Sequence, residues 1–496
     1  MRLKRLVSAA LSAALLISIC ACGPAESAES GPLSSEGVSA SPSPVPGATD
    51  SPENSDVPVS PPPEYDEDHR LNEEIPALIN GLEMPVIGST GYTTVELPLW
   101  PTNPNEIPEP DPAESPSVPE PSPDVPEEPV PPEPSPDESG EPEPPAPEES
   151  EPLPSQFVDI GPEPETSEEP SPDVPGEPDS SEEPSAEPDP GPDESPDPYP
   201  GALAVWEAGK AFLILDEDGD WWYVSRGGET GWIEHRYCMI NLPDVIPSII
   251  YNDTNAYASV FTAANGKEIP NITGKALYES MDSNYRLDRQ EFVMPILYSA
   301  ARNICAAQHR ALAEGNCLVV YQTFRPYEAQ IKVASAMSAL ARTDPDVKAG
   351  ISTPPWSIDW FIATGISNHQ RGYALDASMV KVYATETKYV GAYPYLRVTD
   401  YEDYQMPTPM HELSYAAAAT TGPSNYTQRS ATMNGPAIAL QKYFTSSGLS
   451  LLPSEWWHFN DNSAMRATAD KPSDGRYFTS ECLSCPPEWV SGLLVG

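Results

Sequence analysis

The sequence predicts an α+β fold for the C-terminal half of the chain, from about residue 245 to residue 496. Apolar residues recur every four positions from Phe292 to Ile304, which predicts an amphipathic helix ending near Gly315. The apolar run 318–321 predicts a strand, and residues 327–342 predict a second helix that ends before Asp344-Pro345. Helices alternate with isolated strands and no glycine-rich phosphate loop follows them, so a nucleotide-binding sheet is not expected.

Residues 22–200 predict a disordered, acidic, proline-rich linker. Residues 101–200 hold 34 of the 64 prolines and 31 of the 76 acidic residues, with no lysine or arginine. Such a segment buries too little apolar surface to offset its ordering entropy, and its like charges repel. Residues 201–496 have an ordinary balance of 22 basic and 31 acidic side chains. No basic face is available for phosphate groups, so we expect no nucleic-acid partner.

The first 21 residues have the pattern of an export signal. Three basic residues precede an apolar run over residues 6–19 that is too short to span a bilayer comfortably. The run ends at Ile19-Cys20-Ala21-Cys22, which resembles a bacterial lipobox. The resemblance implies cleavage after residue 21, lipidation of Cys22 and anchoring at the extracellular face of the cell membrane. Plain secretion is the alternative.

The remaining cysteines carry little functional signal. Cys482 and Cys485 form a CxxC pair, but Pro486 and Pro487 follow it where a redox motif needs a helix, so a local disulfide or two inert thiols is expected. His309 lies four residues after Cys305 and could mimic a thiol peptidase dyad on one helix face, although nothing nearby in the sequence orients its imidazole.

Residues 201–242 predict a small β module, since short alternating runs are separated by turn residues. Segment 219–224 reads Gly-Asp-Trp-Trp-Tyr-Val, and segment 230–233 reads Thr-Gly-Trp-Ile. These runs resemble bacterial SH3-like barrels, which accompany many cell-wall enzymes. The aromatic residues would either line a groove for wall peptide or fill the core of a module that acts as a spacer.

Two short segments carry the chemistry. Segment 367–376 reads Ser-Asn-His-Gln-Arg-Gly-Tyr-Ala-Leu-Asp, and segment 455–458 reads Glu-Trp-Trp-His. Two histidines and an aspartate suit a catalytic zinc site, which takes three protein ligands and leaves a fourth position open. We expect a loop His369 beside a strand Asp376, and His458 on one side of a single turn with Glu455, free to act as the base. His411 lacks any such spacing and is expected to be an ordinary loop residue.

Together the motifs Ser-x-His-x-x-Gly-x-Ala-x-Asp and Glu-x-Trp-His resemble the VanY and VanX group of zinc D-alanyl-D-alanine peptidases, which share a fold with the hedgehog signalling domain. The resemblance covers residues 245–496. It implies one zinc ion held by His369, Asp376 and His458, with Glu455 as catalytic base. It further implies that Arg325 binds and polarises substrate, although Phe324 stands where the family has tyrosine. Ser367 would bind substrate or cap its loop.

The expected activity is therefore cleavage of the amide before the terminal D-alanine of peptidoglycan stem peptides by zinc-activated water. A D-alanyl-D-alanine dipeptidase and a peptidoglycan endopeptidase are alternatives. An external location disfavours the dipeptidase, because the free dipeptide is a cytoplasmic precursor. A non-catalytic wall-binding protein is the alternative of another class, and Glu455 argues against it, because a site that only binds has no need for a free carboxylate.

Overall fold

A computed structural model describes residues 61–105, 198–424 and 426–477. The architecture below is that of the unit Pro62–Gly496. The expected signal peptide, Cys22, the pair Cys482 and Cys485, and residues 22–60 and 106–197 of the expected linker lie outside the described ranges. No helix within those ranges has both the length and the apolarity that a membrane span requires.

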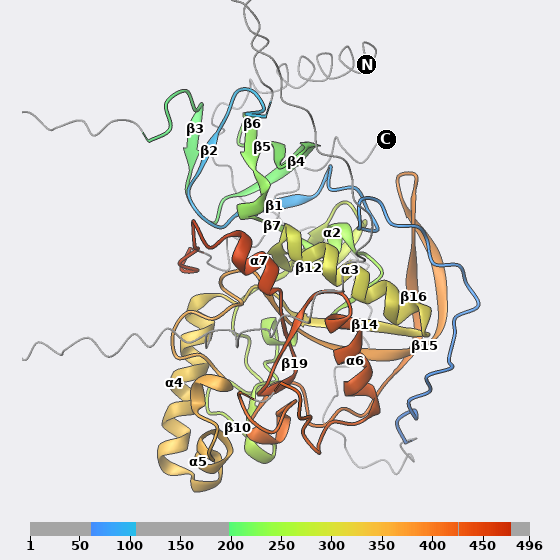
Figure 1. The fold of residues 1–496 in the computed structure, drawn as a ribbon, viewed down its shortest axis with the longest axis vertical. Helices are drawn as coiled ribbons and strands as arrows, with labels where there is room; N and C mark the ends of the chain where they lie inside the picture. Colours follow the sequence, from blue (N-terminus) through green and yellow to red (C-terminus); the bar gives the residue numbers. More distant parts are fainter. Residues whose placement is uncertain (1–60, 106–197, 425, 478–496) are drawn as a thin grey trace, which may run out of the picture. The chain divides into compact units, whose positions relative to one another are not determined.

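One six-stranded sheet forms the framework of the C-terminal half (Figure 1). Five of its strands follow the order β18 (Ser450–Leu452), β19 (Glu455–Asn460), β15 (Ala374–Val390), β14 (Asn316–Gln322) and β8 (Ile250–Tyr251). The sixth, β16 (Tyr393–Asp403), pairs with the distal part of β15 to form a long ribbon. β15 is antiparallel to β14 and β19, whereas β8 is parallel to β14. Mixed helices and strands agree with the predicted α+β class.

Two helices pack on this sheet, and two more form a cluster of their own. Helices α3 (Tyr298–Ala313) and α6 (Gly435–Thr445) contact each other, and both contact the sheet. Helices α4 (Tyr327–Thr343) and α5 (Pro345–Ser352) pack together in a separate apolar cluster. The predicted strand at 318–321 and the predicted helix at 327–342 are confirmed as β14 and α4. Asp344 ends α4 and caps α5, because its side chain accepts from the amides of Asp346 and Val347.

The predicted helix beginning at Phe292 starts later than expected, at Tyr298. Phe292 ends strand β12 (Arg289–Phe292), and Ile296 lies in strand β13 (Pro295–Leu297). Proline lacks an amide hydrogen, so Pro295 is poorly suited to a helix interior but tolerated in an edge strand. The apolar residues 292, 296, 300 and 304 are four apart by coincidence, because the first two lie in strands and the last two in α3.

The strands expected in residues 201–242 form, but within a larger sheet. The strand order is β13, β7 (Cys238–Asn241), β1 (Thr90–Thr93), β4 (Ala211–Asp218), β5 (Trp221–Arg226) and β6 (Glu229–Glu234). A further pair, β2 (Leu97–Leu99) and β3 (Ala204–Trp206), lies beside β6 (Figure 1). In the described part of the chain no closed barrel forms, so the predicted separate SH3-like barrel is corrected to an open sheet. Strands from before residue 201 and after residue 245 complete it.

Residues 61–105 are folded, so the prediction of a disordered linker over all of 22–200 is wrong for this segment. Strand β1 pairs with both β4 and β7 in the middle of the sheet. The segment contributes fully buried apolar side chains to the core, among them Leu82, Met84 and Tyr92. Gly91 permits this packing, since a Cβ there would lie 2.3 Å from the Phe212 ring. The sequence is more apolar over residues 75–100, but the acidic, proline-rich residues on both sides led to one assignment for the whole span.

We expect a chain that begins at Gly201 to lose cooperative folding. It would lack the central strand β1 and the side chains of Leu82, Tyr92, Leu97 and Leu99. Full burial of each such side chain is worth about 1.5–3 kcal/mol. Urea denaturation followed by tryptophan fluorescence should show a broad or absent transition for this chain and a sharp one for residues 62–496. Equal midpoints for the two chains would contradict the assigned role of β1.

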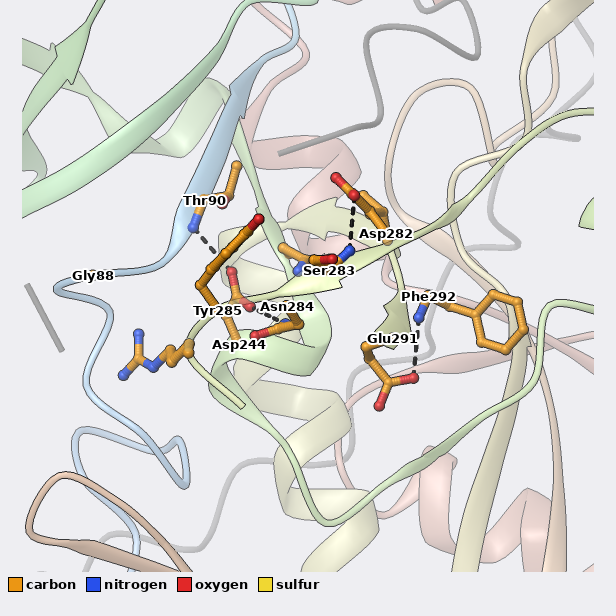
Figure 2. Close-up of a pocket in the computed structure, with 12 residues that line it drawn as sticks. Gly88, Thr90, Asp244, Asp282, Ser283, Asn284, Tyr285, Glu291 and Phe292 are labelled. Carbon is orange, nitrogen blue, oxygen red and sulfur yellow. Dashed lines mark hydrogen bonds between the residues drawn. The ribbon is translucent and has the colours of Figure 1, made fainter. Parts of the chain in front are cut away.

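A small polar pocket lies where segment 61–105 contacts residues 241–293 (Figure 2). It lies beside the hairpin of β11 (Met281–Asn284) and β12. The Asp244 carboxylate accepts from the backbone amide of Thr90 and from the side-chain amide of Asn284. The Arg286 guanidinium donates to the carbonyls of Pro85 and Ile87 at 2.6 and 3.1 Å. The polar side chains of this pocket hydrogen-bond to segment 61–105 and to the hairpin. The pocket is therefore explained by its role in holding the fold together.

Candidate metal centre

Strand pairing brings Asp376 and His458 together. The two residues are direct partners in the β15–β19 ladder, and His458 Nδ1 lies 3.0 Å from Asp376 Oδ1. His369 approaches from a turn before β15, which is closed by the Gly372 amide donating to the His369 carbonyl. Gly372 has a φ of +80°, and a Cβ there would lie 2.7 Å from Met239 Sδ. Only glycine therefore suits the turn that places His369.

The three predicted ligands converge on one point. His369 Nε2 lies 3.2 Å from His458 Nδ1 and 3.4 Å from Asp376 Oδ2. Ligands at zinc distances of about 2.0–2.2 Å in a tetrahedral site lie roughly 3.3–3.5 Å apart. His369 Nδ1 donates to the Thr323 carbonyl at 2.6 Å, and His458 Nε2 donates to Asn460 Oδ1 at 3.1 Å. Each ring therefore directs its unprotonated nitrogen toward the other two predicted ligand atoms, as metal ligation requires.

The electrostatics of the group favour a cation. Two nitrogen lone pairs and a carboxylate face one another inside the protein, where unpaired acceptors are costly. Burial lowers the pKa of His369 to about 4, so its imidazole is neutral at physiological pH. Burial alone would raise the pKa of Asp376, but the imidazoles of His369, His411 and His458 hold it well below its usual value. Two imidazoles and one carboxylate fit zinc by donor chemistry.

Glu455 lies beside this group without belonging to it. It begins β19, and its Oε2 is 3.6 Å from His458 Nδ1. The sequence predicted that Glu455 and His458 lie on one helical turn, and this prediction is wrong. They share a strand, and a register shift opposite Leu451 and Leu452 lets positions three apart face the same side. Burial raises the pKa of Glu455 well above its usual value, and the charge of Asp376 adds to the shift.

Arg325 is buried and is hydrogen-bonded to the predicted ligand Asp376. Its Nε donates to Gln322 Oε1 at 2.6 Å, and one terminal nitrogen donates to Gln330 Oε1 at 2.7 Å. The other donates to Asp376 Oδ2 at 3.0 Å. These bonds use three of the five N–H groups of the guanidinium. Arg325 thus positions Asp376 while lining the cleft described below.

Ser367 lies at the wall of the same cleft, in contact with its own loop. Its backbone amide and hydroxyl both donate to Gln370 Oε1, at 2.6 and 2.8 Å. Gln370 is fully buried, and its side-chain amide donates to the Arg325 carbonyl at 2.7 Å. The structure therefore places Ser367 as a loop cap, the second of the two roles expected for it.

His411 belongs to the centre, although the sequence predicted an ordinary loop residue. Its Nε2 donates to Asp376 Oδ2 at 2.9 Å. The Asn255 side-chain amide donates to His411 Nδ1 at 3.2 Å, and the ring stacks on Phe261 with centroids 4.5 Å apart. His411 does lie in a turn, as expected. No local pattern could have found this role, because its partners lie 35 and 156 residues away.

Replacing His411 with alanine is expected to weaken zinc binding about 10–100-fold, as is typical for a residue that orients a metal ligand. The change removes one N–H donor from Asp376 and leaves the three ligands in place. Titration against a competing chelator measures the affinity. His411→Gln, which can still donate to Asp376, should recover part of it. His69→Ala should have no effect, because His69 contacts the Val382 carbonyl and does not line the cleft. Unchanged affinity in His411→Ala would contradict the assignment.

A hydrogen-bonded chain extends from the centre to Asp253. Gln322 accepts from Arg325 and donates to the Tyr278 hydroxyl. Tyr278 in turn donates to Asp253 Oδ1 at 2.9 Å, and Ser280 donates to Asp253 Oδ2 at 2.9 Å. Burial raises the pKa of Asp253 from 3.8 to about 7, against the effect of these hydrogen bonds.

Asp253 is expected to make stability depend on pH. The folded chain holds the Asp253 proton up to about pH 7, whereas the unfolded chain releases it near 3.8. Between these values the folded state binds more protons, so this contribution to the free energy of unfolding falls as pH rises and then levels off. Urea denaturation across this range should show the fall in the wild type and a weaker fall in Asp253→Asn. Identical pH profiles would contradict the shift.

A cleft of about 930 Å³ opens onto the centre. Its lining includes His369, Glu455 and His458, together with the aromatic residues Phe261, Trp360 and Trp457. Residues 359–369 form a continuous part of its wall, and Arg371 and Arg476 add positive charge. This volume is at the upper end of the roughly 300–1,000 Å³ typical of ligand pockets.

No family model matches the chain, and no curated protein matches it in sequence. The class of site is therefore defined by its own geometry. It is a buried two-histidine, one-aspartate group with an adjacent glutamate, at the base of a cleft.

Proposed function

We propose that this protein is a zinc-dependent cell-wall peptidase that hydrolyses the amide before the terminal D-alanine of peptidoglycan stem peptides. The observation that carries the proposal is the convergence of His369, Asp376 and His458 with Glu455 at 3.6 Å from His458 Nδ1. The motifs that contain these residues resemble those of the VanY and VanX peptidases. The hedgehog-like topology of residues 245–496 is part of the same proposal.

The side chains divide the work of hydrolysis. A zinc ion held by the three ligands would supply Lewis acidity and activate water. Glu455 accepts the proton of the attacking water and returns it to the leaving amine. Its raised pKa suits a group that must hold that proton between the two steps, and a nearby cation would bring the pKa down. Arg325 fixes Asp376 and directs its remaining N–H groups to the oxygen that gains charge.

The cleft favours a peptide chain over a free dipeptide as substrate. Its volume exceeds what two alanine residues fill, and its wall extends along residues 359–369. Arg371 and Arg476 lie in the lining and suit the carboxylates of a stem peptide. Carboxypeptidase action is therefore preferred to dipeptidase action, and an endopeptidase would use the same cleft.

The proposed location follows from the N-terminal sequence. Lipidation of Cys22 would anchor the protein at the extracellular face of the membrane. Residues 22–60 would act as an acidic spacer that lets the folded region reach into the wall, whereas residues 106–197 join the paired strands β2 and β3 and so add no reach. The sheet that contains residues 201–242 would then serve as a spacer or a wall-binding surface.

Incubation of the mature chain with defined muropeptides tests the proposal. Pentapeptide stems, cross-linked dimers and free D-alanyl-D-alanine are compared by mass spectrometry, with and without a chelator. We expect loss of one D-alanine from pentapeptide stems, abolished by the chelator and restored by zinc. Failure to cleave any substrate in the presence of zinc would overturn the peptidase proposal and favour a wall-binding protein.

A further inference from the structure

A second group of metal-binding side chains lies outside the cleft. Cys305 and His309 occupy positions four apart on one face of α3, and Glu83 reaches them from the segment before β1. One donor atom from each of the three lies within 4.8 Å of the other two. His309 Nε2 is 3.3 Å from Glu83 Oε1. None of these residues lines the candidate active-site cleft.

The Glu83 carboxylate is held in a fixed orientation. It is 6% exposed, and its Oε2 accepts from the Ser248 backbone amide at 3.0 Å. Its Oε1 accepts from the Ser248 hydroxyl, which also accepts from Gln308 Nε2 at 2.9 Å. Burying a carboxylate is costly unless positive charge lies nearby. The ionisable groups beside Glu83 are the His309 imidazole and the Cys305 thiol.

We propose that Glu83, Cys305 and His309 form a second cation site, selective for zinc-class ions. A thiolate, a carboxylate and a neutral imidazole together neutralise a divalent ion, which suits a buried position. The sulfur favours zinc over magnesium or calcium. Glu83 and His309 also line a narrow crevice with Ile75, Pro76, Ala77 and Leu312, at the border of the proposed site.

Catalysis by Cys305 is a poorer explanation of the same group. Cys305 is fully buried, and burial raises its pKa far above the usual value, so it lacks the exposed thiolate of a nucleophile. Zinc binding replaces the thiol proton with the ion and releases one proton to solvent. The bound ion would join the segment that contains Glu83 to helix α3. This role is structural, and it does not depend on the proposed peptidase activity.

Cobalt substitution tests the site with a signal that the first centre cannot give. Cobalt bound to a thiolate absorbs in the near ultraviolet, whereas the His369, Asp376 and His458 site contains no sulfur. We expect this band in the wild-type chain loaded with cobalt, in His458→Ala, and in a Cys482→Ser/Cys485→Ser variant that removes the terminal cysteines. The band should disappear in Cys305→Ser and in His309→Ala.

Zinc content provides a second measurement. His309 is partly exposed, with 18% of its side chain accessible, so His309→Ala should remain folded. This variant is expected to bind one zinc fewer than the wild type and to have a lower melting temperature in zinc, with unaltered peptidase kinetics. A wild-type chain without the cobalt–thiolate band, or a band that survives when Cys305→Ser is added to the Cys482→Ser/Cys485→Ser variant, would overturn the second site. Neither result bears on the first centre.

Discussion

Replacing Glu455 with glutamine is expected to lower the rate of stem-peptide hydrolysis by about 10²–10⁴-fold, the range typical of general acid–base catalysis. Glutamine matches glutamate in shape but cannot accept a proton from water. Since Glu455 lies beside the three ligands and is not one of them, zinc content should stay at the wild-type level. Product formation by mass spectrometry and zinc content by elemental analysis together measure both effects.

The control for this substitution is Glu386→Gln on the exposed part of β15, which should change neither quantity. Glu455→Asp keeps the carboxylate but shortens its reach, so an intermediate rate is expected. Activity in Glu455→Gln close to that of the wild type would show that another group accepts the proton.

Replacing His458 with alanine is expected to remove zinc from the active-site centre and to reduce hydrolysis to the level of the chelated protein. His458 supplies one of the three proposed ligand atoms and is the cross-strand partner of Asp376. Two remaining ligands hold a divalent ion weakly, and Asp376 would then be left with Arg325 and His411 as partners. Zinc affinity and turnover should therefore fall together, in contrast to Glu455→Gln.

His235→Ala is the matched control for this second substitution, because His235 lies in the other sheet region, at the start of a short helix after β6. It should leave zinc affinity and turnover unchanged. Retention of full activity in His458→Ala would contradict the proposed ligand set.

The paired motifs predicted which side chains come together, because each motif contains its own chemistry and spacing. A loop His369 and a strand Asp376 appear as expected, and their meeting with His458 follows from one antiparallel pairing. Glu455 was placed beside His458 for the wrong local reason. A register shift within a strand pair depends on the neighbouring strand, and no residue pattern within 455–458 reveals it.

Long-range pairing also explains what the sequence could not predict. His411 acts through partners distant in the chain, and its own surroundings give no sign of them. The β module was expected to be self-contained, but its sheet takes β1 from residues 90–93 and β13 from residues 295–297. Segment 61–105 was assigned by the composition of its flanks, although Tyr92 and Leu82 are as buried as any core residue.

The zinc content of the Cys305→Ser chain tests the central claim most directly, because this background removes the second site and leaves the first. After the Cys305→Ser chain is loaded with zinc and dialysed, we expect one zinc ion per chain. We expect none when His458→Ala is added. A Cys305→Ser chain that binds no zinc, or one whose zinc survives the loss of His458, would contradict a centre built from His369, Asp376 and His458.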